Sequence, residues 1–231
     1  MVYGYGSRLI VGTGKYSYSG GPFRTYFVGR SAQNVVTVAG IRYRAAAATP
    51  LRFRIETAQA YGLSLQVTGN AGIRDTRTIV YSRSGGYLVV DDRLKAGSSH
   101  TYTQLWHLAS GSHPTRTGTT IQTHSAGGDV VIRQLLGRPS ISIVAGRLSP
   151  IQGWRTTHYN KRTRAPAILA RLTGRSARFL TLIVPVPDAS MVVRVVSVHA
   201  FADGYRIVVA IDGRTEQMVV HGSAVSITPL G

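Results

Sequence analysis

Gly86–Leu108, with the sequence GYLVVDDRLKAGSSHTYTQLWHL, is the stretch that decides the fold. Its two ends, residues 87–92 and 101–108, are rich in β-branched and aromatic side chains, and successive residues of a strand fall on opposite faces. Lys95–Ser99 lies between them and is rich in the small and polar residues of turns. The stretch therefore predicts a β-hairpin that carries acidic, aromatic and imidazole groups in an all-β protein.

The rest of the chain has the pattern of the same fold class. Short runs of Val, Ile, Thr and Tyr recur along the 231 residues between Gly, Ser, Asn and Asp, and no long segment keeps a helical period. We expect one domain over residues 1–231, an all-β fold of the large two-sheet antiparallel β-sandwich type. Turns expected at Asp203-Gly204, Asp212-Gly213 and His221-Gly222 predict a terminal antiparallel meander at about residues 192–231. Ala45–Pro50 is expected to form a loop or a short helical turn.

Composition excludes several classes of protein. Apolar residues make up 43% of the chain, enough for a buried core, yet no run approaches the roughly 18 apolar residues of a membrane helix. We therefore expect no membrane partner. The chain has no cysteine, which excludes disulfides, thiolate nucleophiles and cysteine metal sites. Met1 leads into an expected strand, so no secretory signal is expected there, and the compartment stays open.

Several segments resemble, in the same order, the C-terminal β-sandwich of the heparinase II/III-like and alginate-lyase-like polysaccharide lyases. The order and spacing of the segments make the resemblance specific, and it covers most of the chain. It implies a sandwich without the α/α-toroid domain of that family, whose members are often periplasmic or secreted. The segments that carry it are Ser7–Tyr18 (SRLIVGTGKYSY), Ser31–Gly40 (SAQNVVTVAG), Ile73–Leu94, TQLWHL at 103–108, Gln152–Trp154, Arg164–Ile168 and Phe179–Pro185.

The resemblance implies cleavage of uronate-containing glycans by β-elimination. In this reaction a base removes the proton α to the uronate carboxyl, an acid protonates the departing glycosidic oxygen, and a polar group neutralises the carboxylate. In the family these groups lie mostly on the toroid, and the sandwich contributes a histidine from a segment that would precede Met1. We therefore expect this chain to be inactive alone and to need a toroid, which a separate chain can supply. His107 is the leading remaining candidate for a catalytic residue, ahead of His100 and His158, although a histidine at a strand end is more often structural.

Two positions argue against a bound metal. Where the resemblance implies an aspartate in the first turn the chain has Gly12, and where it implies a histidine before asparagine it has Gln33. Glycine has no ligating side chain, and an amide is a poor zinc ligand beside imidazole or carboxylate. We predict no zinc and no other cofactor.

The charge is extreme, with 27 Lys and Arg against 9 Asp and Glu and a formal net charge of +18. Such a field attracts polyanions, and arginine, the dominant cation, binds carboxylate, sulfate or phosphate through two parallel hydrogen bonds. This chemistry suits an acidic polysaccharide of the heparin, alginate or hyaluronan type. It suits a nucleic acid equally well, although the arginines are scattered along the chain and no helix-turn-helix, RRM or zinc-finger pattern is present. A third interpretation is a basic, solvated surface without a partner.

The predicted substrate-binding groups combine aromatic, guanidinium and amide side chains. Sugars stack on aromatic rings while arginines bind their acidic groups. The alternative is that Tyr16 and Tyr18 are half-buried strand residues. Trp106 and Trp154 are expected in the core, and Asp91 and Asp92 are expected to act in the turn or to bind arginine. The residues predicted to bind substrate are Tyr16, Tyr18, Arg24, Tyr26, Asn34 and Arg77.

Three functions remain open at this stage. The first is the sandwich part of a heparinase II/III-like lyase. The second is a module that binds acidic glycans without cleaving them. The third is a basic nucleic-acid-binding protein, which would bind DNA or RNA more tightly than glycans at matched charge and salt.

Overall fold

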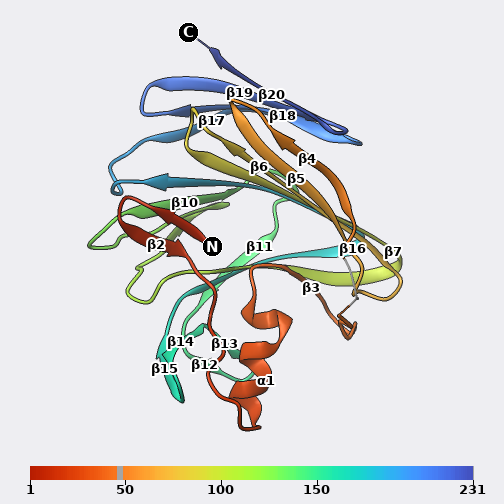
Figure 1. The fold of residues 1–231 in the computed structure, drawn as a ribbon, viewed down its shortest axis with the longest axis vertical. Coiled ribbons are helices and arrows are strands. Elements are labelled where there is room, and N and C mark those ends of the chain that lie inside the picture. The colour runs from red at the N-terminus through yellow and green to blue at the C-terminus, as the bar shows by residue number, and fades with distance from the viewer. Residues whose placement is uncertain (46–48, 231) are drawn as a thin grey trace.

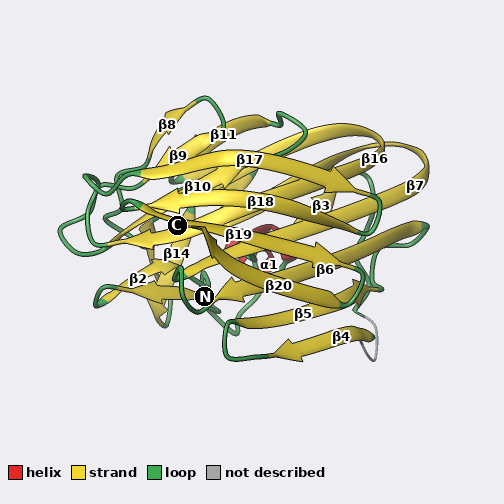
Figure 2. Ribbon diagram, turned by 90° about the horizontal axis from the view of Figure 1, so that it is seen from above, coloured by secondary structure: helices red, strands yellow, loops and turns green. Residues whose placement is uncertain are grey.

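Antiparallel β-strands form most of the computed structural model, which describes residues 1–45 and 49–230 (Figures 1 and 2). The predicted all-β sandwich is confirmed. One short helix, α1 (Pro22–Val28), is followed by a 3₁₀ turn at Arg30–Ala32. Neither described helix is long and apolar enough to cross a membrane. The expectation for Ala45–Pro50 includes residues 46–48, which lie outside the described residues.

Two large sheets form the body of the molecule. The main sheet has ten strands, in the order β4-β5-β6-β7-β16-β10-β9-β8, with β3 paired to β7 and β11 paired to β16. The terminal sheet has the order β17-β18-β19-β20. The main-sheet strands are β3 (Val36–Val38), β4 (Leu51–Glu56), β5 (Ala60–Val67), β6 (Ile73–Ser82), β7 (Tyr87–His107), β8 (Thr115–Thr117), β9 (Thr120–Gln122), β10 (Asp129–Gln134), β11 (Ser140–Val144) and β16 (Ala167–Val186), and those of the terminal sheet are β17 (Val193–Phe201), β18 (Gly204–Ile211), β19 (Arg214–His221) and β20 (Ala224–Leu230).

Three small hairpins complete the fold. They are β1 (Val2–Gly4) with β2 (Ser7–Ile10), β12 (Arg147–Leu148) with β13 (Ile151–Gln152), and β14 (Trp154–His158) with β15 (Lys161–Arg164). The last two hairpins and α1 lie together at the lower end of the molecule in Figure 1.

The hairpin predicted for Gly86–Leu108 is wrong, because β7 is one continuous strand of 21 residues. Residues 88–95 and 100–107 of this strand pair with β16, and the register shifts where Gly174 is opposite His100 and Ser176 is opposite Lys95. The Gly-Ser-rich residues after Lys95 therefore form an irregularity inside a ladder and not a chain reversal. At this point the two paired strands bend together, so the sheet folds over itself at the right of Figure 1.

The fold of the sheet creates a second apolar layer. Val90 and Ile183, from one half of the bent ribbon, pack with Trp106 and Ile168 from the other half. The other layer lies between the main and terminal sheets, where Val80, Val89 and Leu182 pack with Ile207 and Met218. Each strand of the central ribbon thus buries both faces, which explains why its sequence is apolar on both sides.

Two of the expected terminal turns are displaced by one residue. The chain reverses at Asp212-Gly213 as predicted, with positive φ at both residues. The other reversals lie at Ala202-Asp203 and Gly222-Ser223, since Gly204 and His221 belong to strands. A Cβ at residue 204 would lie 1.8 Å from the carbonyl oxygen of Val220, so Gly204 is required by close packing of neighbouring strands.

Candidate functional site

Asn34 is the centre of a buried polar cluster at the lower end of the main sheet. Its Nδ2 donates to the carbonyl oxygen of Val11 at 2.9 Å, and its Oδ1 accepts from the backbone N–H of His107 at 2.7 Å. The same oxygen lies 3.1 Å from Nδ1 of His107. Asn34 thereby ties the loop after α1 to the N-terminal segment and to the end of β7.

His107 is buried in this cluster, with 2% of its surface exposed. Because an amide oxygen only accepts hydrogen bonds, the contact with Asn34 places the ring proton on Nδ1. Burial lowers the pKa of His107 to about 4. Its Nε2 makes no hydrogen bond within the described part of the chain. The side chain is therefore a neutral imidazole held inside the protein.

Arg77 and Asp92 form a buried ion pair beside this cluster. Arg77 donates from Nε to Oδ1 of Asp92 at 2.6 Å and from Nη2 to Oδ2 at 2.7 Å, and its Nη1 donates to the carbonyl oxygen of Asn34. Gln104 Nε2 also donates to Asp92 Oδ2 at 2.8 Å. The guanidinium of Arg77 is thus committed to protein partners, which leaves it a structural role in this arrangement.

Tyr26 lies behind the same cluster. Its hydroxyl donates to Oε1 of Gln152 at 2.7 Å, and Gln152 Nε2 donates to the carbonyl oxygen of Ser31 at 3.1 Å. Burial raises the pKa of Tyr26 to about 12. The hydroxyl therefore stays protonated near neutral pH and serves to fasten α1 to β13.

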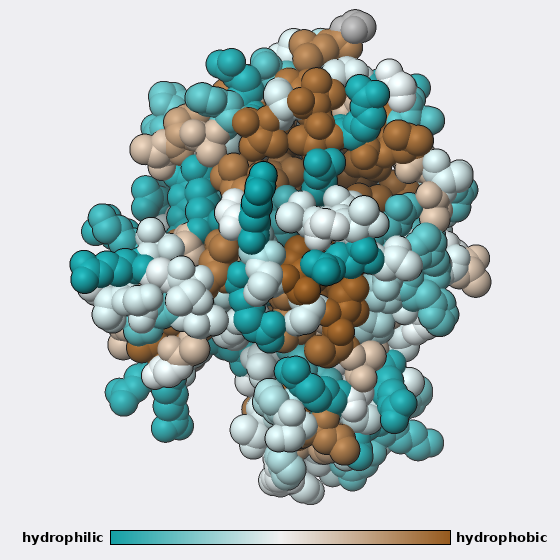
Figure 3. Space-filling model, turned by 180° about the vertical axis from the view of Figure 1, so that it is seen from behind, coloured by the Kyte–Doolittle hydropathy of each residue, from teal (hydrophilic) through white to brown (hydrophobic). Residues whose placement is uncertain are grey.

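An exposed cluster of rings and cations covers the lower end of the molecule, and we call it the aromatic–basic surface. It is built by the loop before α1, by α1 itself and by the β14–β15 hairpin, which lie side by side in Figure 1. Hydrophilic residues dominate this end in Figure 3, whereas apolar residues gather higher on that face. The surface comprises Lys15, Tyr16, Tyr18, Phe23, Arg24, Trp154, Tyr159 and Arg162.

Arg162 is the best-positioned cation of this surface. Its guanidinium carbon lies 3.9 Å from the ring centre of Phe23 and 5.3 Å from that of Trp154, and Nη1 donates to the hydroxyl of Tyr16 at 3.1 Å. Stacking on rings fixes the plane of a guanidinium without consuming its in-plane N–H donors. Arg162 can therefore present paired donors to a planar carboxylate or to a sulfate.

Beside Arg162, a shallow groove of about 320 Å³ runs between residues 14–18 and 156–159. Tyr18 and Tyr159 stack along it with ring centres 6.2 Å apart, and both are more than half exposed. Lys15 Nζ lies 4.3 Å from the ring centre of Tyr18. Exposed rings next to ammonium and guanidinium groups offer an apolar face beside donors for an acidic group.

The residues predicted to bind substrate thus divide into two groups. Tyr16, Tyr18 and Arg24 lie on the aromatic–basic surface, and both tyrosines occupy a loop instead of a strand. Tyr26 is buried, and Asn34 and Arg77 have protein partners for their polar groups. Of this second group, Tyr26 belongs to the apolar cluster against which Tyr16, Phe23 and Trp154 of the surface pack.

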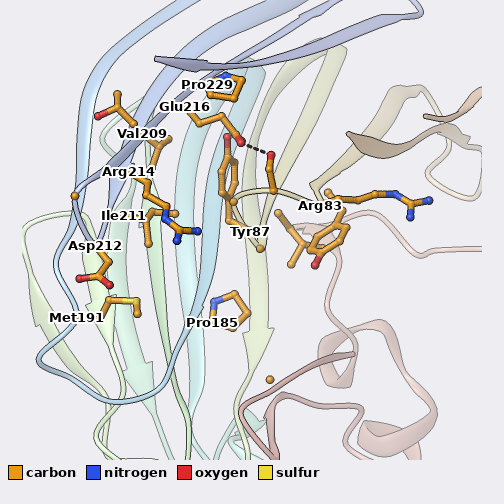
Figure 4. A pocket seen from close by; sticks show the side chains of 18 of the residues that line it. Arg83, Tyr87, Pro185, Met191, Val209, Ile211, Asp212, Arg214, Glu216 and Pro229 are labelled. Atoms are coloured by element: carbon orange, nitrogen blue, oxygen red, sulfur yellow. Dashed lines mark hydrogen bonds between the residues drawn. The ribbon is translucent and has the colours of Figure 1, made fainter. Parts of the chain in front are cut away.

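A larger cavity of about 970 Å³ lies elsewhere, between the N-terminal hairpin, the turn after β6 and the terminal sheet (Figure 4). Glu216 lines it, and Ser82 Oγ donates to Oε1 of Glu216 at 2.6 Å while Ser84 Oγ donates to Oε2. Burial and the charge of Glu216 raise the pKa of Tyr87 far above its ordinary value. The carboxylate is therefore already hydrogen-bonded by the protein, and Tyr87 stays protonated.

Comparison with known proteins identifies the family. The family model for the heparinase II/III-like C-terminal region matches residues 1–211. The chain belongs to this family. No curated protein matches the sequence.

Solved structures share the fold of this heparinase II/III-like domain. The heparan sulfate lyase HepC from Pedobacter heparinus superposes with a TM-score of 0.80 at 16% identity, over 95% of this chain and 35% of that one. A heparinase III superposes with a TM-score of 0.72 at 14% identity, over 97% of this chain and 34% of that one. The heparinase II/III-like domain thus spans about a third of the length of these lyases.

The residues at the positions implied for a metal do not form a metal site in this heparinase II/III-like domain. Gly12 has no side-chain donor, and Gln33 is exposed with its backbone N–H bound to the carbonyl oxygen of Arg30. Within residues 1–45 and 49–230, no group of three or more His, Cys, Asp or Glu side chains is arranged to hold a metal ion. The absence of zinc stays a prediction.

Sequence reasoning missed the contribution of the β14–β15 hairpin. The basic residues Lys161, Arg162 and Arg164, close after Trp154, were the available signal. Trp106 is buried as expected, with Nε1 donating to Gln104 Oε1 at 3.0 Å. Trp154 is instead half-buried, and its ring lies beside the guanidinium of Arg162.

Proposed function

We propose that this domain is the sandwich part of a polysaccharide lyase that cleaves uronate-containing glycans by β-elimination. In this proposal the domain needs a helical toroid for catalysis. The observation that carries the proposal is the family match over residues 1–211, together with a fold shared with lyases three times as long. The aromatic–basic surface supplies the chemistry for the substrate. In this role Arg162 and Lys15 bind the acidic groups, and Tyr18 and Tyr159 contact the sugar rings.

The dependence on a toroid follows from the proton-transfer groups. β-Elimination needs a base for the proton α to the carboxyl and an acid for the leaving oxygen. His107 is buried, has a pKa of about 4 and carries its proton toward Asn34, so it is a poor candidate for either role. Tyr26 is likewise buried and bound to Gln152. Neither buried group is placed to transfer these protons, and in this proposal the proton-transfer groups come from the toroid.

A lyase assay tests the proposal. The chain is mixed with heparan sulfate, alginate or hyaluronan, and the ultraviolet absorbance of the unsaturated uronate product is followed, with and without a heparinase II/III-like toroid domain joined to it. We expect a rise in absorbance only when the toroid is present. A rise with the chain alone contradicts the dependence on a toroid.

The same assay separates the second candidate function, a module that binds acidic glycans without cleavage. This alternative is favoured by the buried state of His107, because this imidazole is then not available to a substrate as an acid or a base. No product in either arm, combined with salt-sensitive binding to heparan sulfate, contradicts the lyase proposal and supports the binding module.

A further inference from the structure

A second cationic site lies on the other face of the main sheet, away from Asn34 and His107. Strands β5, β6 and β7 bury Ala60, Val80 and Val89 against the terminal sheet. Beyond the apolar part, the same face continues with hydroxyl and cationic side chains, among them Ser64, Thr78, Thr76, Arg74, Arg93 and Lys95. Arg77 and Asp92 point to the opposite face, since neighbouring residues of a strand alternate.

This polar part of the sheet is the floor of a pocket of about 530 Å³. The turns Ala202-Asp203 and Gly222-Ser223 of the terminal sheet form one wall, and Arg52 and Phe53 of β4 form another. Its volume lies within the range of small-molecule sites. The pocket therefore has space for a saccharide unit.

The arrangement of the cations is unfavourable without an anion. Arg74 and Lys95 are directly opposite each other in the β6–β7 ladder, and like charges in such a pair destabilise a sheet. Within the described part of the chain, neither residue nor Arg52 forms an ion pair with a carboxylate. An oxyanion between Arg74 and Lys95 would relieve this repulsion.

The other charged side chains around the pocket already have protein partners. Arg93 donates from Nε to Oδ2 of Asp91 at 2.8 Å and from Nη1 to the carbonyl oxygen of Ala202. Asp203, the carboxylate at the rim, lies 3.0 Å from Nε2 of His221, which balances the negative charge only when the imidazole is protonated. The uncompensated positive charge is thus concentrated at Arg52, Arg74 and Lys95. Thr76, which lies between Arg74 and Thr78 on the same face of β6, adds a hydroxyl to the pocket.

We propose that this pocket binds the sulfate group of an anionic saccharide between Arg74 and Lys95, as a site separate from the aromatic–basic surface. The choice of a saccharide rests on the proposed function, whereas the preference for a tetrahedral oxyanion rests on the cations alone. Bidentate guanidinium and point-like ammonium donors together suit sulfate, and the half-buried ring of Phe53 offers an apolar contact for the sugar.

Calorimetric titration tests the proposal on the whole chain. The ligands are a sulfated heparin disaccharide, the same disaccharide without sulfate, inorganic sulfate and inorganic phosphate. The pocket variant combines Arg74→Gln with Lys95→Gln. The control combines Arg116→Gln, on β8 at the opposite edge of the main sheet, with Arg194→Gln on β17, and removes the same charge.

We expect the sulfated disaccharide to bind the wild-type chain and the control alike, and to bind the pocket variant about tenfold more weakly. Removing sulfate from the disaccharide should have an effect of the same size. Thermal unfolding of the unliganded pocket variant should occur at an unchanged or higher temperature, because the repulsion between Arg74 and Lys95 is gone.

Four results overturn the proposal. Equal losses in both variants show attraction by net charge alone, and an unchanged affinity of the pocket variant shows that the sulfate binds elsewhere. If inorganic sulfate or phosphate binds as tightly as the disaccharide, the pocket is a site for free oxyanions, and the proposal that it binds a saccharide is contradicted. If heparan sulfate polymer binds while the disaccharide does not, the pocket proposal fails and the proposed function stands.

Discussion

At the scale of single residues, Asn34 is the side chain that connects the segments of the buried polar cluster. It connects the N-terminal segment, the loop after α1 and the end of β7 through two short hydrogen bonds and the contact with the His107 ring. Its backbone carbonyl also accepts from Arg77. The sequence placed Asn34 in the site, but its role is to position other groups.

Replacing Asn34 tests this role. Asn34→Ala leaves the carbonyl of Val11 and the N–H of His107 without their side-chain partner, so we expect a loss of about 2–4 kcal/mol in the free energy of unfolding. Urea unfolding measures it. Gln33→Ala, a substitution of the exposed neighbouring amide, is the control and should change stability by less than about 0.5 kcal/mol. Equal effects of the two substitutions contradict the assignment.

His107 makes stability depend on pH. Its pKa is about 4 in the folded protein and about 6.5 when unfolded, so the unfolded state binds the proton more readily in this range. Its contribution is complete above pH of about 6.5 and is lost as the pH falls toward 4, by about 3 kcal/mol in total.

The measurement compares unfolding of the wild-type chain and His107→Gln at several pH values. Asp75, whose pKa is raised by burial to about 7, changes stability in the opposite direction over the same range, so only the difference between the two proteins isolates His107. The stability difference should grow as the pH rises from 4 to 6.5 and then level off. A difference that does not vary with pH would show that His107 is not buried as a neutral group.

At the scale of elements, the strands were predictable and the path of the chain between them was not. The alternation of residues 87–92 and 101–108 located both halves of β7. Gly-Ser-rich residues serve equally well in a hairpin turn and in a bulge, and only the long-range partner β16 decides between them. The contacts of Arg162 with Phe23 and Trp154 likewise bring α1 next to the β14–β15 hairpin. These elements are far apart in sequence, so no local pattern predicts the contacts.

Asp91 of β7 couples the two large sheets. It accepts from Arg178 and Arg93, and Arg178 donates onward to the carbonyl oxygens of Phe201 and Gly204 at one end of the terminal sheet. The carboxylate is fully buried, so removing it leaves two partly buried arginines without their counter-ion.

Asp91→Ala should therefore cost about 3–5 kcal/mol in the free energy of unfolding. Hydrogen–deuterium exchange should accelerate in β17 and β18 before it does in the centre of the main sheet, because the arginines fasten that edge. Removing the exposed Arg54–Glu56 pair with Arg54→Ala is the control, with an expected change below about 1 kcal/mol. Uniform exchange in both sheets would contradict the coupling.

At the scale of the whole molecule, composition predicted a class of ligand, and the structure shows how the charge is distributed. The net charge of +18 pointed to polyanions without choosing among them. The structure places exposed rings next to Lys15 and Arg162, and a separate set of uncompensated cations around Arg74. Side-chain positions of this kind depend on loop conformations, which composition does not determine.

The most direct test of the account is calorimetric titration of the chain with heparan sulfate over a series of salt concentrations. We expect binding that weakens as salt rises and that is weakened further by Arg162→Gln, while Arg138→Gln, an exposed control in another loop, leaves affinity nearly unchanged. Tighter binding to a nucleic acid of matched charge and salt, or equal effects of the two substitutions, would contradict a glycan-binding surface built around Arg162.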